Sequence, residues 1–249
     1  MESLMELQPQ PKCVSPTAPI WQDVLAQAVT GELVAAINYD ALAEICDDPE
    51  EAGEALEHAA IERRHAAAFV AAGRHLGVDV ASNVDGKHWK RLRESFMACI
   101  AERDYIGCLI VQEIMLESFA LASYTRVAAV APESLGKVFG AIAADERRHA
   151  DHAIAILKAE RDADPPRFDD KLHRLHCEVM TTLAKMLAKE CKDGHCEVCV
   201  SSCVKPSLFE VSLSAAQLRG ASLQQYLKTL DALGLPGEIT LTWIAQLPV

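Results

Sequence analysis

Apolar and polar positions follow a helical period along this chain. The clearest case is the segment 168–190, where Leu172, Leu175, Val179 and Leu183 recur three or four residues apart and form one apolar stripe. Half of the 249 residues are apolar, which is enough for a sizeable core. The chain shows neither a β-α-β alternation nor a strand-rich half. The pattern therefore predicts an all-α fold.

Turn-forming residues divide this pattern into separate helices. Pro49 is placed to open the second helix after an aspartate pair, and the connection between Gly77 and Gly86 is rich in turn formers. Residues 1–19 are predicted to form a disordered N-terminal tail, and residues 20–249 a single domain. The predicted helices span about residues 20–45, 49–75, 87–131, 133–159, 168–190, 222–233 and 238–247.

Two Glu-x-x-His motifs indicate that one two-helix unit is used twice. The motifs are Glu62-Arg-Arg-His65 and Glu146-Arg-Arg-His149, and each follows a single glutamate, Glu32 or Glu117, by 30 or 29 residues. On a helix, residues three positions apart share a face, so each motif directs a carboxylate and an imidazole toward one point. Together the four carboxylates and two imidazoles form a complete ligand set for two metal ions.

This ligand set indicates a particular architecture. A four-helix bundle in which two helices each supply one glutamate, and two each supply Glu-x-x-His, holds a di-iron or di-manganese centre. Carboxylate and imidazole ligands without thiolates favour iron or manganese over structural zinc. Iron is the stronger inference, because two carboxylate-bridged irons can take up O2 and split it after two-electron reduction. The sequence therefore predicts a ferritin-like bundle with two irons, or with manganese or a mixed pair, and additional C-terminal helices.

Glu117 lies in the apolar context Ile-Met-Leu-Glu-Ser-Phe-Ala-Leu. An unpaired carboxylate there would cost several kcal/mol or would take up a proton, so a cation is expected to face it. The alternative is that Glu117 points outward. Glu113, one turn earlier, competes for the same role, but it precedes Glu146 by 33 residues and fits the interval of the first half less well. Glu117 is therefore the predicted ligand.

Three further side chains are placed to support the ligands. Asp145 directly precedes Glu146 and is expected to orient an imidazole across the bundle, namely His65, unless it is an exposed helix residue. Tyr39 and Tyr124 follow the two single glutamates by seven residues and so return to the same helix face. Their hydroxyl groups either bond to the ligands or are satisfied elsewhere in the core.

The net charge and the N-terminal sequence limit which binding partners and which cell compartment we expect. A formal net charge of −12 argues against nucleic acid, because affinity for phosphate backbones comes from clustered lysine and arginine. The N-terminal segment carries Glu2 and Glu6 and no continuous apolar stretch, unlike a signal peptide, so a cytoplasmic protein is expected. The most apolar stretch, residues 105–124, contains Glu113 and Glu117, so no membrane span is predicted.

A cysteine cluster interrupts the helical pattern at about residues 191–206. Four of the nine cysteines lie there with the spacing C-x4-C-x2-C-x3-C, at Cys191, Cys196, Cys199 and Cys203. Such a cluster can close a zinc site or hold an iron–sulfur cluster, and redox thiols or a disulfide are the alternatives. His173 and His176 could join a metal site there, although surface positions are the stronger expectation for both.

With these residues placed, the chain resembles the cyanobacterial-type aldehyde-deformylating oxygenases, also called fatty aldehyde decarbonylases, of the ferritin-like superfamily. The resemblance covers roughly residues 20–190 and resumes weakly over residues 222–247. It rests on the motifs Gly31-Glu32, Asn38-Tyr39, Glu62-Arg-Arg-His65, Cys108-Leu-Ile-Val-Gln112, Glu117-Ser-Phe-Ala-Leu-Ala-Ser-Tyr124 and Asp145-Glu146-Arg-Arg-His149. It implies that the iron ligands are Glu32, Glu62, His65, Glu117, Glu146 and His149, surrounded by Tyr39, Gln112, Tyr124 and Asp145.

By similarity, the implied activity converts a fatty aldehyde to an alkane one carbon shorter plus formate, with O2 and externally supplied electrons. An electron donor such as an acidic ferredoxin would need a basic docking site on this acidic protein. The one dense basic cluster is a candidate for this docking site, and the alternative is that it is simply the solvated start of a helix. The cluster comprises Lys87, Lys90, Arg91 and Arg93. A monomer or a small homo-oligomer is expected.

A long apolar substrate needs a dry channel that ends at the metals. Small side chains near the ligands either leave room for this channel or reflect tight helix packing, and they are Ala35, Ala36, Ala66, Ala67, Ala68 and Ala120. Other functions stay open. They are a di-iron oxygenase that hydroxylates or N-oxygenates another small metabolite or modifies tRNA, a non-catalytic ferritin-like iron-binding protein, and a zinc-stabilised interaction module with an inert bundle site.

Overall fold

The structure, a computed structural model, describes residues 16–187 and 205–248. In these two ranges the regular secondary structure is entirely helical, which confirms the predicted all-α class. The elements are α1 Ala18–Ile45, α2 Pro49–His75, α3 Lys87–Ala101, α4 Tyr105–Leu109, the π-helix η1 Ile110–Leu116, α5 Glu117–Val130, α6 Glu133–Ala163, α7 Pro165–Met186, the 3-10 helix η3 Lys205–Val211, α8 Ala215–Ala232 and α9 Gly237–Ala245.

Capping residues explain where several helices begin. Asp48 accepts a hydrogen bond from the backbone N–H of Glu50 at 2.8 Å, and Pro49 takes the first position of α2, as the sequence predicts. Ser214 caps α8 in the same way, so this helix begins seven residues earlier than predicted. The other boundaries differ less: α1 begins at Ala18 rather than 20, and α7 covers residues 165–186 rather than 168–190.

The predicted third helix, residues 87–131, is wrong as a single element. The chain reverses after α3, where Arg103 has a φ of 53°, in the left-handed region. Asp104 then caps α4 by accepting a hydrogen bond from the backbone N–H of Gly107 at 3.0 Å. At this turn the Arg103 guanidinium donates to Asp47 at 2.8 Å, on the exposed surface. The third bundle helix is therefore the rod formed by α4, η1 and α5.

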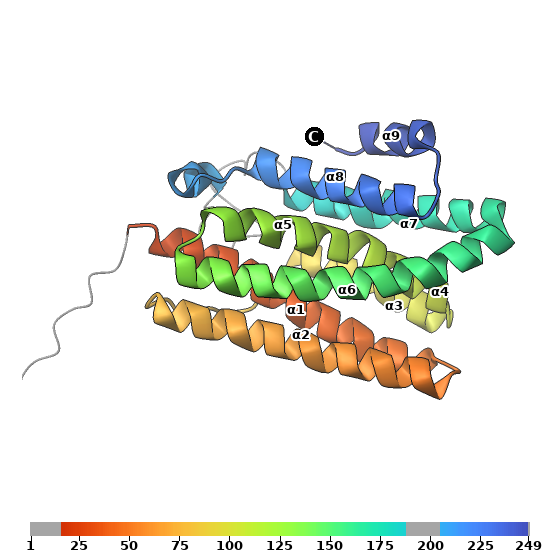
Figure 1. Cartoon of the computed structure of the whole chain (residues 1–249), viewed down its shortest axis with the longest axis horizontal. Coiled ribbons are helices and arrows are strands. Elements are labelled where there is room, and N and C mark those ends of the chain that lie inside the picture. The colour runs from red at the N-terminus through yellow and green to blue at the C-terminus, as the bar shows by residue number, and fades with distance from the viewer. Residues whose placement is uncertain (1–15, 188–204, 249) are drawn as a thin grey trace, which may run out of the picture.

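Four rods form the bundle that holds the site. In Figure 1, α1 and α2 run antiparallel along one side, and the rod that ends in α5 pairs with α6 beside them. The remaining elements cover this bundle: α8 lies along α5, and α7 packs against both α3 and α6. The additional C-terminal helices predicted from the sequence thus shield the face of α5 that α1 and α2 do not contact.

Polar residues divide the core into two apolar clusters. One cluster contains Leu42, Phe96 and Ile114, and the other contains Leu25 and Phe139. On each bundle helix a ligand candidate separates the two clusters. In the third rod, for example, Leu116 at the end of η1 belongs to the first cluster and Leu121 of α5 to the second, with Glu117 between them. A belt of carboxylates and imidazoles therefore crosses the middle of the bundle.

Within residues 16–187 and 205–248, one helical segment, Tyr105–Val130, is long and apolar enough to cross a membrane by length and composition. It is the rod formed by α4, η1 and α5, and 72% of its most apolar window is buried inside the protein. Burial in the bundle accounts for its apolar character, because a core helix of this length needs apolar residues on every side.

Two predictions concern segments outside the described residues. The predicted tail falls mostly on residues 1–15, and the cysteine cluster falls on residues 188–204. Both stay predictions. Four of the nine cysteines lie in the described ranges, and all carry free thiols: Cys46, Cys99, Cys108 and Cys177.

Candidate metal centre

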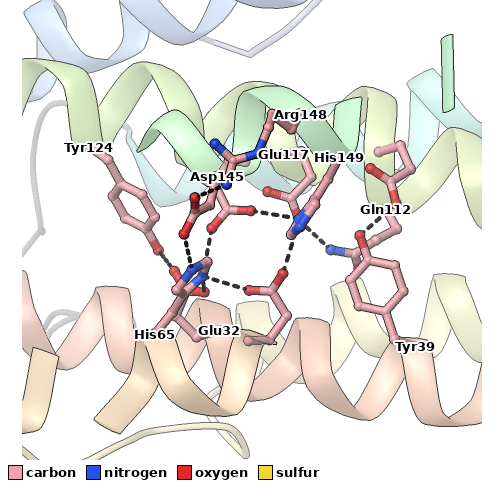
Figure 2. A network of polar contacts seen from close by, with 12 residues as sticks. Glu32, Tyr39, His65, Gln112, Glu117, Tyr124, Asp145, Arg148 and His149 are labelled. Atoms are coloured by element: carbon pink, nitrogen blue, oxygen red, sulfur yellow. Dashed lines mark hydrogen bonds and ion pairs between the residues drawn. The ribbon is translucent and has the colours of Figure 1, made fainter. Parts of the chain in front are cut away.

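The six predicted ligands meet in the middle of the bundle. All are buried, with 1 to 7% of each residue exposed. Figure 2 shows side chains from opposite helices pointing toward one another, with Glu32 and His65 below and Glu117 and His149 above. The set comprises Glu32 of α1, Glu62 and His65 of α2, Glu117 of α5, and Glu146 and His149 of α6.

His65 forms the first half of the centre. Its Nδ1 atom lies 2.9 Å from Oε1 of Glu146, 3.3 Å from Oε2 of Glu32 and 3.4 Å from Oε2 of Glu62. One ligand atom from each of these four residues lies within 4.8 Å of the others. Three carboxylate oxygens and one imidazole nitrogen therefore converge on one point.

His149 forms the second half. Its Nδ1 atom lies 3.3 Å from Oε2 of Glu146 and 3.5 Å from Oε1 of Glu62. Glu62 and Glu146 each direct one carboxylate oxygen at His65 and the other at His149. In this arrangement the two carboxylates could bridge two neighbouring cations.

Five of the nitrogen and oxygen atoms that face the centre have no hydrogen-bond partner among the described residues. In the described part of the chain, eight buried side-chain nitrogen or oxygen atoms lack a hydrogen-bond partner, and five of them belong to the Glu62, His65, Glu146 and His149 side chains. Buried polar atoms are rarely left unpaired, because desolvation without a partner is costly. Cations between these atoms would satisfy them, and a donor set of oxygen and nitrogen without sulfur suits iron or manganese.

Glu117 is positioned by a chain of amides. Gln112 donates a hydrogen bond from Nε2 to Oε1 of Glu117 at 2.7 Å, and Asn38 donates from Nδ2 to Oε1 of Gln112 at 2.8 Å. All three residues are buried. Glu117 therefore points inward, which excludes the alternative that it faces outward. Gln112 fixes the orientation of its carboxylate beside His149 (Figure 2).

The two tyrosines bond to carboxylates on opposite ends of the network in Figure 2. The Tyr124 hydroxyl donates to Oε1 of Glu32. The Tyr39 hydroxyl donates to Oε1 of Glu113 at 2.5 Å, rather than to Glu117. Burial, together with the nearby carboxylates, raises the pKa of both tyrosines well above 10, so both stay protonated as donors.

Asp145 lies beside His65, as the sequence predicts. Its Oδ2 atom is 3.2 Å from Nε2 of His65, and Arg148 donates to its Oδ1 atom. An Nε2–H bond to this carboxylate leaves the Nδ1 lone pair of His65 directed into the centre. His149 instead stacks on the ring of His58, with centroids 4.3 Å apart, so the two halves differ. Sequence spacing gave no signal for His58.

Burial and mutual repulsion control the protonation of the centre. Burial raises the pKa of Glu32 and Glu117 well above 4.5, and that of Glu113 to about 7. Burial alone would lower the pKa of His149, but its contacts with Glu146 and Glu62 outweigh this and raise the pKa to about 10. Without cations, the carboxylates and imidazoles of the centre therefore retain protons, and metal binding would release these protons.

An apolar cavity of about 160 Å³ ends at the centre. Its polar wall includes Glu32, Glu62, Gln112 and Glu117. The rest is mainly apolar, and of the alanines predicted to leave room for a channel, Ala35 and Ala120 line it. The other predicted alanines, Ala36, Ala66, Ala67 and Ala68, do not line it.

The predicted basic cluster lies at the start of α3, close to this cavity. Lys87 and Arg91, together with Lys185 of α7, border a hollow on the surface. Trp89 of the same helix lines the cavity and donates a hydrogen bond from Nε1 to Oε1 of Gln27 at 3.1 Å. A molecule bound at this basic surface would therefore be separated from the cavity by one helix.

Comparisons with known proteins agree with this geometry. A solved structure of a protein with aldehyde deformylating oxidase activity from Synechococcus superposes with a TM-score of 0.78 and 19% sequence identity, over 94% of this chain and 98% of that chain. This likeness confirms the predicted ferritin-like fold. The sequence also matches the profile of the family described as long-chain fatty aldehyde decarbonylase over residues 20–199. The chain belongs to the long-chain fatty aldehyde decarbonylase family.

Proposed function

We propose that this protein is an aldehyde-deformylating oxygenase, which converts a long-chain fatty aldehyde to an alkane one carbon shorter plus formate. The observation that carries this proposal is the pair of carboxylates, Glu62 and Glu146, that each face both imidazoles, beside an apolar cavity that Glu62 helps to line. The reaction uses O2, four electrons and four protons, and it releases one water with the alkane and formic acid. One oxygen atom of O2 then appears in formate and the other in water.

Two iron ions are the proposed cofactor. The ligands would be Glu32 and His65 on one side and Glu117 and His149 on the other, with Glu62 and Glu146 shared between the sides. When bound, two such irons supply the electron transfer that activates O2, which no side chain of the centre can perform. The unpaired buried donor atoms and the absence of sulfur among them support this choice.

The surrounding residues hold the ligands in place. Asp145 orients the His65 ring, Tyr124 holds one oxygen of Glu32, and Gln112 holds one oxygen of Glu117. Because these bonds occupy the outer atoms of the ligands, the inner atoms face the shared centre without rearrangement.

The cavity walls position the substrate. Leu116, Phe119 and Val127 are among the apolar side chains that would contact the alkyl chain and exclude water from it. The aldehyde group would then lie at the polar end, beside Glu32, Gln112 and Glu117. An apolar chain thus fixes which end of the substrate reaches the metals.

We further propose that an acidic electron donor, such as a ferredoxin, docks at the basic start of α3. Lys87, Arg91 and Lys185 lie there around one surface hollow, on a protein whose net charge of −12 would repel an acidic partner elsewhere. Association that depends on this surface should weaken as ionic strength rises, because salt screens exposed charges.

The test is product formation by the iron-loaded protein. The reduced protein is supplied with a long-chain aldehyde, O2 and a donor whose electron delivery has been verified, and formate and alkane are quantified. Formate and alkane in equal amounts support the proposal. Iron-loaded protein that consumes O2 without forming formate would show that a different substrate is oxidised.

A further inference from the structure

Glu113 is a fifth buried carboxylate beside the metal centre. It lies in the π-helix η1 and is 2% exposed. Its Oε1 atom accepts the hydrogen bond from Tyr39. Its Oε2 atom is buried and has no hydrogen-bond partner in the described part of the chain, a property that it shares with Nδ1 of His149 and both carboxylate oxygens of Glu146.

The repeated unit shows that Glu113 has the tyrosine partner that its symmetry would give to Glu117. Tyr39 follows Glu32 by seven residues, and Tyr124 follows Glu117 by the same interval. Tyr124 donates to Glu32 of the other half, so a symmetric pairing would join Tyr39 to Glu117. Tyr39 instead donates to Glu113. A tyrosine thus holds Glu113 as the other tyrosine holds Glu32.

Ring contacts place Glu113 on the His149 side of the centre. Tyr39, its hydrogen-bond donor, packs edge-on against His58 with ring centroids 5.1 Å apart. His58 in turn stacks on His149. The Glu113 carboxylate also interacts electrostatically with His149, Glu62 and Glu146. Apart from the shared Glu62 and Glu146, two carboxylates therefore lie on this side, those of Glu113 and Glu117.

A metal ion would satisfy the free oxygen of Glu113, whereas a proton would not. A proton on Oε2 would create a buried donor without an acceptor, which is unfavourable. We propose that Glu113 is a further carboxylate ligand of the metal ion on the His149 side, additional to Glu117. This inference rests on the proposed function only in requiring that the centre holds a metal pair.

The two terminal carboxylates face different surroundings. Glu117 lines the apolar cavity, whereas Glu113 does not. A substrate that enters the cavity can therefore contact Glu117 but not Glu113. When substrate fills the cavity and contacts Glu117, coordination by Glu113 keeps the ion on the His149 side attached to the protein.

Anaerobic calorimetric titration of the apo protein with Mn²⁺ tests the assignment. Wild-type protein should bind two ions per chain. In Glu113→Gln, the affinity for one ion should fall roughly tenfold or more, while the other ion binds as in wild type. Replacing a direct ligand should cost at least as much affinity as replacing a residue that only holds a ligand in place. The matched control is Glu133→Gln, whose side chain is 84% exposed, and it should bind both ions normally.

Two further variants separate a ligand from a structural carboxylate. Tyr39→Phe keeps the Glu113 carboxylate and removes its hydrogen-bond donor, so it should weaken the same ion by a smaller factor. The double variant Glu113→Gln/Glu117→Gln should lose that ion completely and also lose the EPR signal of a coupled manganese pair. If Glu113→Gln binds each of the two ions with the same affinity as wild type does, the inference is overturned. Failure of wild-type protein to bind two ions would instead overturn the proposed function.

Discussion

Glu146 and Glu62 act as a pair, because each carboxylate faces both imidazoles of the centre. Glu146 places Oε1 2.9 Å from Nδ1 of His65 and Oε2 3.3 Å from Nδ1 of His149, and Glu62 faces the same two atoms with its own oxygens. The two halves of the repeated unit thus share their ligands. Neither half can be changed at Glu62 or Glu146 without affecting the other.

Replacement of a shared carboxylate should therefore remove more metal than replacement of a terminal one. Glu146→Gln is expected to weaken both ions, because its two oxygens face both sides of the centre. Glu32→Gln should weaken only the ion on the His65 side, since Glu32 contacts His65. Metal content per chain after anaerobic loading and desalting measures this. Loss of a single ion in both variants would contradict shared ligation.

Asp145 should matter for metal affinity although it is not a proposed ligand. Asp145→Asn weakens the hydrogen bond that orients the His65 ring, and comparable changes behind metal ligands cost roughly 10- to 100-fold in affinity. The loss should fall on the His65-side ion. The control on the same helix is Asp151→Asn, because Asp151 is exposed. Unchanged titration curves for Asp145→Asn would show that the ring is held by packing alone.

Spacing along the sequence was sufficient to find the centre, because helical geometry is regular between the ligands. The interval of three residues in each Glu-x-x-His motif and the interval of about thirty between paired helices bring the six side chains together in the middle of the bundle. The contact of Asp145 with His65 followed from the same reasoning. Their roles as ligands and supports stay predictions that the experiments above test.

Regular spacing failed where the backbone departs from an α-helix. The spacing argument favours Glu117 over Glu113, because the interval from Glu113 to Glu146 is three or four residues longer than the intervals of the two halves, yet Glu113 is buried beside the centre. The π-helix η1 contains Glu113 and lies between α4 and α5, and its wider turns change which side chains face inward. No pattern of apolar residues distinguishes a π-turn from the surrounding α-helix.

Long-range packing explains the other differences. The sequence favours a surface position for His176, but this residue is 2% exposed, because Tyr226 of α8 and Trp243 of α9 pack against it. Its ring nitrogens lie 3.1 Å from the Tyr226 hydroxyl and 3.3 Å from the Trp243 carbonyl oxygen. These partners follow 50 and 67 residues later in the chain, beyond the reach of any local pattern.

The turn between α3 and α4 should contribute to stability through Asp104. This side chain caps α4 and forms an ion pair with Lys171 of α7, and both partners are largely buried. Asp104→Ala is expected to lower the free energy of unfolding by about 2 kcal/mol, since loss of a cap alone costs about 1 kcal/mol and Lys171 is left unpaired. Urea unfolding measures the change.

Asp48 offers a matched control for that change. It caps α2 through the backbone N–H of Glu50, at an exposed position. Asp48→Ala should cost only about 1 kcal/mol, the value of the cap. Equal losses in the two variants would show that the Lys171 ion pair adds nothing.

His176 should make the protein less stable in mild acid. Burial, with a smaller contribution from His173, lowers its pKa from 6.5 to about 4, although its hydrogen bond to Trp243 opposes this. The folded protein keeps His176 neutral, while the unfolded chain takes up a proton below pH 6.5. The contribution of His176 to the free energy of unfolding is therefore present above pH 6.5 and is lost as the pH falls toward about 4. The loss is on the order of 3 kcal/mol.

Urea unfolding of wild type and His176→Gln from pH 7.5 to 4.5 measures this contribution. Glutamine keeps a hydrogen-bonding side chain that does not titrate, so the stability of the variant should fall less steeply with decreasing pH. Contributions from the metal centre are common to both proteins and cancel in the difference. Parallel stability curves over this range would mean that the folded protein accommodates a charged His176, which its position between Tyr226 and the Trp243 carbonyl argues against.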